Sequence, residues 1–460
     1  MSNMEASGSK EKDTLKQALV EAQDKYTHVE SQARQLALTV ENLQNKLVEA
    51  EQKEQIEKEN IEKAIQIEKN RILKVNGDNL VRGKQIFSNE CQTVVLGTDD
   101  SIILAGSLYP LHHSNGFARV IKIPDTPNDD SSLILNTSPG GRIIAFKQDS
   151  HTFHILQHNS QAQYFSVPKV ASVRQISITN GNNIFVLYSN GDVMHSDRLP
   201  YSCNRNWTRL IFAEPIEKLS TSQHSMLALG KSGKVYGMGS NRLGQLGVPG
   251  YGTNLISADP YFIYEPEMPE PAKDIFVTEA NGAVIGVSGK LYITGSYMAR
   301  TGLGEKEKAY LECFRKFEHV PTEGPVVNVA LGGFHTMIIL EDGRLFGCGL
   351  NTAGQLGHPI RPNYSSYSGK DDIDDGTGQI GQRSQFISIP LPQGIKAKQV
   401  TCGSFHTVVL LENNQVLGFG CNKYGEIGVE ALPPRVQWTN SEFSSPGESP
   451  HPIPANMRFW

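Results

Sequence analysis

The stretch HTMIILEDGRLFGCGLNTAGQLG, residues 335–357, decides the fold of this chain. It contains a short apolar run, a polar turn with a glycine, and a second strand-like run that ends at glycine. Two further clear copies read SMLALGKSGKVYGMGSNRLGQLG from Ser225 and HTVVLLENNQVLGFGCNKYGEIG from His406. A hairpin of this kind cannot bury its own apolar face, so several copies must pack side by side around a shared core.

Seven copies of the hairpin can be aligned on their turn residues. Their first positions are Gln92, Arg142, Asn183, Ser225, Asn281, His335 and His406. Between copies, an apolar stretch ends at a proline in five places: Pro124, Pro168, Pro215, Pro321 and Pro390. Proline is tolerated at the end of a strand or at a sheet edge, so each copy adds two linking strands to its two hairpin strands. Seven four-stranded units predict an all-β seven-bladed propeller over residues 80–430.

The glycine-rich ends of three copies resemble the repeat of the regulator of chromosome condensation family. The pattern GxNxxGQLG occurs at 239–247 and 349–357, GxNxxGEIG occurs at 420–428, and a GxFHT element ends at Thr336 and at Thr407. The resemblance implies a seven-bladed propeller. It also implies guanine-nucleotide exchange on the small GTPase Ran, and nucleosome binding. The loop positions needed for exchange have no residue-by-residue counterpart here, and a mixed-charge helix stands where the founding member has a basic arm.

The motif residues are interpreted as structural. They are Gly244, Gln245, Gly247, His335, Gly354, Gln355, Gly357, His406, Gly425 and Gly428. A buried amide between glycines can satisfy backbone groups in a tight loop. The slot of the two histidines holds Gln, Arg, Asn or Ser in other copies, which argues against a general base. The six cysteines include no CxxC pair, and no enzyme signature is found, so the sequence predicts no catalytic residue, no metal and no cofactor.

The N-terminal part is predicted to be helical. Residues 10–75 contain no proline or glycine and are rich in Glu, Lys, Gln and Ala. Apolar or small residues recur there at alternating steps of four and three, among them Leu15, Leu19, Val29, Leu36, Val40, Leu43 and Leu47. This 3.5-residue period predicts a coiled coil that pairs with a second copy or with another helical protein, after a disordered segment 1–9. A charged single helix or a disordered tail is the alternative.

Two further segments invite a functional interpretation. The insertion 358–384 contains Asp371, Asp372, Asp374 and Asp375, which could coordinate calcium if they converged, although the liganding glutamate of an EF-hand loop is absent. A solvated acidic loop and a contact surface for a basic partner are the other interpretations. The segment 431–460 is expected to supply a ring-closing strand and a tail.

Composition limits the function classes. The formal net charge of −5 gives no global basic field for nucleic acid or anionic membrane, and no apolar run is long enough for membrane insertion. We therefore expect an intracellular protein, cytoplasmic rather than nuclear. The leading hypothesis is a non-enzymatic scaffold that oligomerises or docks through the coiled coil and binds a protein partner on the propeller face. The alternatives are an exchange factor or regulator of a small GTPase, and a chromatin-binding propeller.

Overall fold

The computed structural model divides the chain into two units, Met1–Gly77 and Asp78–Trp460. In the first unit it describes residues 14–46 except 38, 41 and 45. In the second it describes 82–456 except 90–91, 99–100, 107–118, 122–132, 138–142, 148–150, 157–161, 180–182, 197–206, 250–261, 297–300, 304–313, 361–379, 393, 423–424 and 429–450. The statements below concern these residues.

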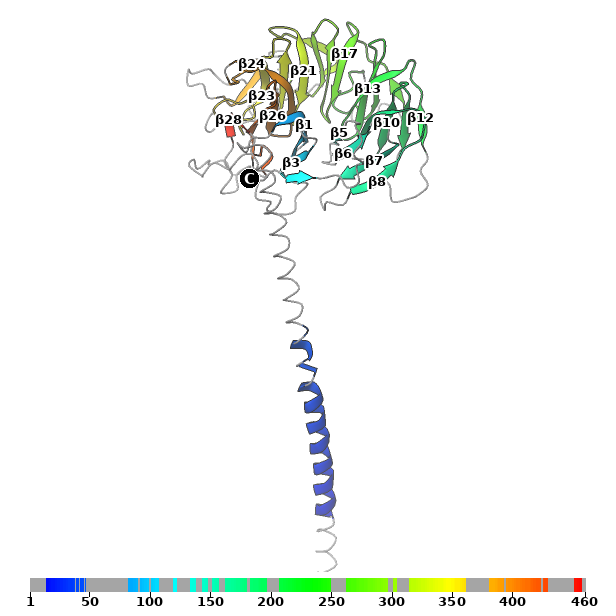
Figure 1. Cartoon of the computed structure of the whole chain (residues 1–460), viewed down its shortest axis with the longest axis vertical. Helices are drawn as coiled ribbons and strands as arrows, with labels where there is room; N and C mark the ends of the chain where they lie inside the picture. Colours follow the sequence, from blue (N-terminus) through cyan, green and yellow to red (C-terminus); the bar gives the residue numbers. More distant parts are fainter. Residues whose placement is uncertain are drawn as a thin grey trace, which may run out of the picture. The chain divides into compact units, whose positions relative to one another are not determined.

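The first unit contains an α-helix (Figure 1). Residues 14–37 are helical, as are 39–40, 42–44 and 46. The absence of proline and glycine and the many good helix formers explain this conformation. Across the described part of the chain, no helix combines the length and the apolarity that crossing a membrane requires.

The second unit is built from seven four-stranded antiparallel sheets, each formed by consecutive strands. The first four blades contain β1 Gly83–Asn89, β2 Gln92–Gly97, β3 Ile102–Gly106, β4 Arg119–Ile121; β5 Leu133–Thr137, β6 Ile143–Lys147, β7 Thr152–Leu156, β8 Ala162–Ser166; β9 Val173–Ile178, β10 Ile184–Tyr188, β11 Val193–Ser196, β12 Thr208–Leu210; β13 Ile216–Thr221, β14 Ser225–Gly230, β15 Val235–Gly239, β16 Ile263–Tyr264. The last three contain β17 Ala272–Val277, β18 Asn281–Gly286, β19 Leu291–Gly295, β20 Phe314–Val320; β21 Val326–Leu331, β22 His335–Leu340, β23 Leu345–Leu350, β24 Gln382–Ile389; β25 Ala397–Cys402, β26 His406–Leu411, β27 Val416–Gly420, β28 His451–Asn456.

The first strand of each blade is the innermost one. Each of these strands packs against the first strand of the next blade, and β25 of the last blade packs against β1 of the first. The seven sheets therefore form a closed ring around a common axis (Figure 1). This arrangement confirms the predicted seven-bladed propeller.

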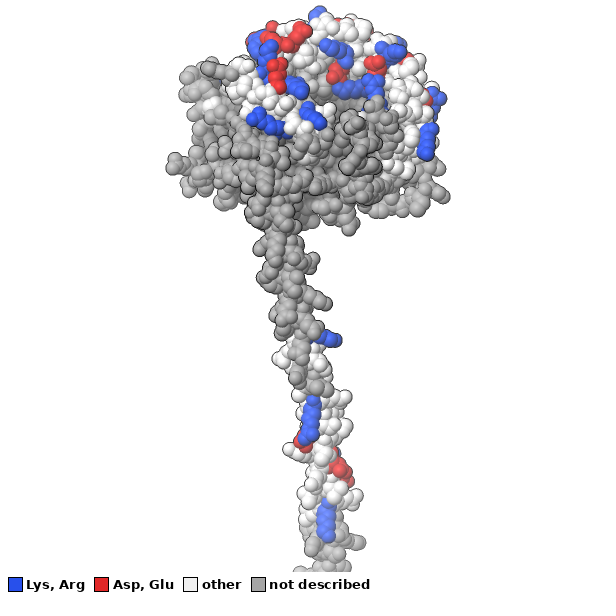
Figure 2. All heavy atoms as spheres, viewed as in Figure 1, with Lys and Arg blue, Asp and Glu red and all other residues white. Residues whose placement is uncertain are grey.

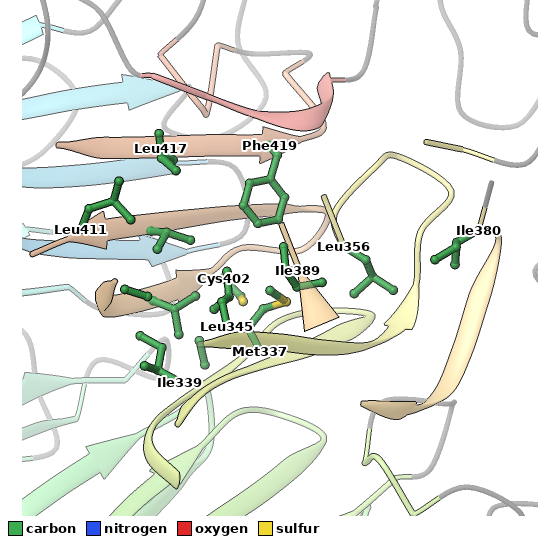
Figure 3. Packing of buried hydrophobic residues seen from close by; sticks show 14 residues of the cluster. Met337, Ile339, Leu345, Leu356, Ile380, Ile389, Cys402, Leu411, Leu417 and Phe419 are labelled. Carbon is green, nitrogen blue, oxygen red and sulfur yellow. The ribbon is translucent and has the colours of Figure 1, made fainter. Parts of the chain in front are cut away.

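The core lies between the faces of neighbouring blades. In one cluster, Met337 and Ile339 of blade 6 pack with Leu411 and Phe419 of blade 7 (Figure 3). Every residue of β22 and of β26 is buried. A strand covered on both faces reads as a continuous apolar run, which is why the hairpins could be recognised in the sequence.

The first and last blades are joined without a shared strand. The N–H of Gly83 donates to the carbonyl of Asn414 at 2.9 Å. The amide of Gln399 both accepts from the N–H of Ile86 at 3.1 Å and donates to its carbonyl at 2.8 Å. Asn414 has a φ of 64° in the turn position that glycine occupies in other blades, a conformation that asparagine tolerates.

The C-terminal segment contributes a strand to the last blade. Within 431–460 the structure describes β28, which pairs with β27 at the outer edge of the seventh sheet. The strand thus completes blade 7, and blades 7 and 1 meet through β1, β25, β26 and the turn at Asn414. The domain boundaries proposed from the sequence otherwise remain predictions.

Candidate functional site

The glycine-rich motif forms a hydrogen-bonded loop after the third strand of a blade. In blade 4, the Asn241 side chain accepts from the N–H of Leu246 at 2.9 Å and donates to the carbonyl of Val248 at 3.0 Å. The Gln245 carbonyl oxygen accepts from the N–H of Leu243 at 3.0 Å, and its amide donates to the hydroxyl of Ser225 at 3.2 Å. Both side chains are buried. Their polar atoms stabilise the loop and are not exposed for chemistry.

The same loop recurs in blades 6 and 7. Asn351 accepts from the N–H of Leu356 at 2.8 Å, and Gln355 accepts from the N–H of Ala353 at 2.8 Å. In blade 7, Asn422 accepts from the N–H of Ile427 at 3.2 Å. Gly244, Gly247, Gly354, Gly357, Gly425 and Gly428 all have positive φ angles in these loops. Such a backbone favours glycine, which explains the spacing of the motif.

The two motif histidines connect neighbouring blades. The Nε2 atom of His335 lies 2.8 Å from the hydroxyl of Thr407 in the next blade. That hydroxyl donates to the carbonyl of Gln355 at 2.8 Å. The Nε2 atom of His406 lies 3.3 Å from the hydroxyl of Thr93 in blade 1. Both rings are buried, so these histidines act as links between blades.

Burial also determines the charge of His406. It lowers the pKa of the ring to about 4, against an ordinary value near 6.5. The imidazole is therefore neutral at neutral pH. A neutral ring inside a hydrogen-bonded blade interface has no access to a substrate.

The three cysteines that the structure describes are not fully exposed. Cys348 and Cys402 are buried and Cys421 is partly buried, and none of the three forms a disulfide. Burial raises the pKa of the Cys402 thiol and keeps it protonated. Among the described residues, no three His, Cys, Asp or Glu side chains gather closely enough to hold a metal ion.

The predicted interaction residues are only partly described. Asp371, Asp372, Asp374 and Asp375 lie outside the described residues, as does Leu47. The other six apolar residues named for the predicted coiled coil lie on the helix of the first unit. Their exposed fractions are 66% for Leu15, Leu19 and Leu36, 61% for Val29 and Leu43, and 47% for Val40. An apolar stripe is thus open to solvent along the helix, although the coiled coil itself is not shown.

A second set of links between blades was not predicted from the sequence. Gln175 of β9 accepts from the N–H of Leu219 at 3.0 Å and donates to its carbonyl at 2.7 Å. Asn328 of β21 accepts from the N–H of Val400 at 3.2 Å. Lys218 of β13 forms a salt bridge with Asp274 of β17. These side chains share one position, the third residue of an innermost strand, and a recurring polar residue there is the signal that could have revealed them.

The exposed surface carries charges of both signs. Figure 2 shows basic and acidic side chains interspersed over the described surface of the propeller. Several acidic groups are already bonded within the blades: Glu214 accepts from the Ser232 hydroxyl at 2.6 Å, and Glu270 accepts from the Ser288 hydroxyl at 2.6 Å. These carboxylates therefore take part in the fold of their own blades.

Comparison with known proteins identifies the repeat. The model of the regulator of chromosome condensation (RCC1) repeat matches residues 326–355 and 397–426, which lie in blades 6 and 7. The secretion-regulating guanine nucleotide exchange factor of Bos taurus is 31% identical over 134 residues, which cover 29% of this chain and 24% of that protein. The regulator of chromosome condensation of Mus musculus is 24% identical over 209 residues, which cover 44% of this chain and 46% of that protein. The chain thus spans less than half the length of these curated relatives.

A solved structure shows the same fold. Prp20p from Saccharomyces cerevisiae, described together with its binding to Gsp1p and histones, superimposes with a TM-score of 0.52 at 15% identity. The superposition covers 81% of this chain and 76% of that one. The resemblance to RCC1 repeats that the motifs indicated is therefore confirmed, together with the propeller that it implies.

Proposed function

We propose that this RCC1-repeat propeller is a non-enzymatic regulator that binds a small GTPase and promotes release of its guanine nucleotide. The partner class is suggested by the repeats in blades 6 and 7 and by the similarity to an exchange factor and to a regulator of chromosome condensation. This is the alternative function considered from the sequence; the similarity to these relatives gives no specific support to the leading hypothesis of a scaffold.

The observation that carries this proposal is that the buried polar side chains of the repeat motif form hydrogen bonds within the propeller. The side chains of His335, His406, Gln245 and Asn351 bond to neighbouring loops or blades. Nucleotide exchange needs no covalent chemistry by the regulator, because it is a coupling between two binding equilibria. A rigid ring that exposes loops is suited to such a role, since loops on a rigid scaffold commonly carry binding residues.

The first test is binding to GTPases in defined nucleotide states. Immobilised full-length chain is exposed to a panel of small GTPases, each prepared without nucleotide, with GDP or with a non-hydrolysable GTP analogue. A regulator that promotes release must bind the nucleotide-free form more tightly than the GDP form, because the coupling is reciprocal. The proposal expects this preference for at least one GTPase. Equal affinity for all three forms, or no binding across the panel, would contradict it.

The helix supports a second function, association of two copies. Its apolar stripe has no partner within the described chain, and the stripe follows a heptad period in which Leu15 and Val29 occupy d positions and Leu19 and Val40 occupy a positions. Burying such a stripe against an identical helix removes apolar surface from water. We infer that the helix pairs two chains.

Charges beside the stripe favour a parallel pair. In this heptad frame Lys25 takes a g position and Glu30 the following e position. In a parallel, in-register pair, Lys25 of one helix faces Glu30 of its partner helix, with opposite charges. Within its own helix, Glu30 bonds Arg34 at 2.9 Å. Pairing would place two propellers in one particle and raise their avidity for a clustered partner.

A further inference from the structure

Exposed side chains form a ring at one end of the innermost strands. In six of the seven blades, the pairing between the first and second strands shifts register after the first residue of the inner strand. The residue skipped by the pairing is exposed in every case: Lys84, Arg174, Glu217, Lys273, Val327 and Lys398. A β-bulge turns its extra residue away from the regular ladder. These six residues are called the bulge ring.

Backbone hydrogen bonds place the bulge ring at one end of the propeller. The first residue of an inner strand donates its N–H to the hairpin turn of the preceding blade. Ile216 donates to Gly191 at 3.0 Å, Ala272 donates to Gly233 at 2.8 Å, and Val326 donates to Gly289 at 2.8 Å. The skipped residue follows directly. All six therefore surround the axis at the end of the hairpin turns, whereas His335 and His406 lie at the opposite end of their strands.

The bulge ring is basic although the chain is acidic overall. It contains four basic side chains and one carboxylate, in a protein with a formal net charge of −5. Within the described residues, Arg174, Lys273 and Lys398 make no salt bridge. The neighbouring Lys218 and Asp274 bond each other and add no net charge. The net charge of the chain therefore does not argue against an anionic partner at this position.

We propose that the bulge ring binds an acidic peptide segment of a protein partner. The hairpin turns around the ring carry charges of both signs: Asp192 and Asp342 bond Arg209 and Arg344, and the other turns carry Glu412, Lys231 and Lys290. A nucleic-acid duplex lying across this end would place many of its phosphates over turns that carry acidic as well as basic groups, since its charge is spread along the whole helix. A flexible acidic peptide can place its carboxylates beside the ring residues near the axis without lying across the surrounding turns. The ring therefore favours a peptide, and this binding is separate from the proposed action on a GTPase.

The test uses the full-length chain and a fluorescein-labelled peptide of ten glutamates, followed by anisotropy at low and moderate ionic strength. The ring variant is R174E/K273E/K398E. The matched control is K169E/K231E/K290E, which reverses three exposed lysines outside the ring, two of them, Lys231 and Lys290, in hairpin turns at the same end of the propeller. We expect the ring variant to bind at least about tenfold more weakly and the control to stay within about twofold. Binding by the unaltered chain should weaken with salt.

Each outcome decides the proposal. Equal losses in the ring variant and the control, or no binding by the unaltered chain, would overturn it. So would a duplex DNA oligonucleotide that binds more tightly than the peptide and is lost in the ring variant. If the ring variant fails to fold, R174Q/K273Q/K398Q removes the same charges without adding repulsion. Nucleotide release by the ring variant is measured in parallel, so that loss of peptide binding with normal release separates this inference from the proposed function.

Discussion

The Nε2 atom of His406 lies 3.3 Å from the hydroxyl oxygen of Thr93, although the two residues are 313 positions apart in the sequence. This contact connects the last blade to the first. Gln399 and Ile86 connect the same two blades nearer the axis. The ring is therefore closed by side chains and short backbone contacts, since each sheet is made of consecutive strands.

The buried state of His406 predicts a dependence of stability on pH. The native state holds the ring neutral with a pKa of about 4, whereas the unfolded chain takes up a proton below about 6.5. Above pH ~6.5 His406 is neutral in both states and does not lower the free energy of unfolding. As the pH drops towards ~4, protonation of the unfolded state lowers the free energy of unfolding by up to about 3 kcal/mol. Thermal unfolding between pH 7 and 4 should show this loss.

Two variants isolate the His406 contribution. H406Q removes the titrating group and should flatten the pH profile, even if it lowers the unfolding midpoint at neutral pH. H406N removes the same titrating group and should flatten the profile in the same way. An unaltered slope in H406Q would show that other groups cause the loss.

The close approach of Glu214 to Gly230 predicts that substitutions at these two positions have coupled effects on stability. A side chain at Gly230 would overlap the Glu214 carboxylate, and the equivalent pair in blade 6 is Gly324 with Leu340. We expect G230L to destabilise the propeller by about 1–3 kcal/mol through overpacking. The double variant E214G/G230L should be more stable than G230L alone, despite losing the bonds of Glu214 to Ser232. Denaturant unfolding of both single variants and the double variant measures this coupling.

The closure of the ring predicts that two glutamines, Gln399 and Gln85, contribute differently to the stability of the propeller. Q399A leaves the N–H and carbonyl of Ile86 without their side-chain partner and should cost about 1–3 kcal/mol. Gln85 occupies the same position in β1 but is exposed, so Q85A should change stability by less than ~0.5 kcal/mol. Similar losses for the two variants would mean that the Gln399 bonds contribute little to closure.

The helix predicts self-association. V29E/L36E places two carboxylates in the apolar stripe and should convert a dimer to a monomer in sedimentation velocity, because charges in a coiled-coil core are poorly tolerated. S31E/Q35E adds the same charge outside the stripe and should leave the dimer intact. A full-length chain that sediments as a monomer at all accessible concentrations would refute the dimer.

The sequence predicted the hairpins well because β22 and β26 are buried on both faces and so appear as continuous apolar runs. It could not reveal the bulges, because a skipped residue such as Lys398 depends on register between two strands. A recurring polar third residue of the inner strands was the sequence signal for the links of Gln175 and Asn328, but their partners depend on how neighbouring blades align. The outer strand β28 is separated from β27 by a long segment, which local patterns do not bridge. The partner depends on surface loops, which the strand pattern does not determine.

The most direct test of the proposed function is the release of fluorescently labelled GDP from small GTPases in excess unlabelled nucleotide. The account predicts that a substoichiometric amount of the full-length chain accelerates release from at least one GTPase, with a rate that increases with chain concentration. Release at the intrinsic rate for every GTPase tested, with the propeller shown to be folded, would contradict the account.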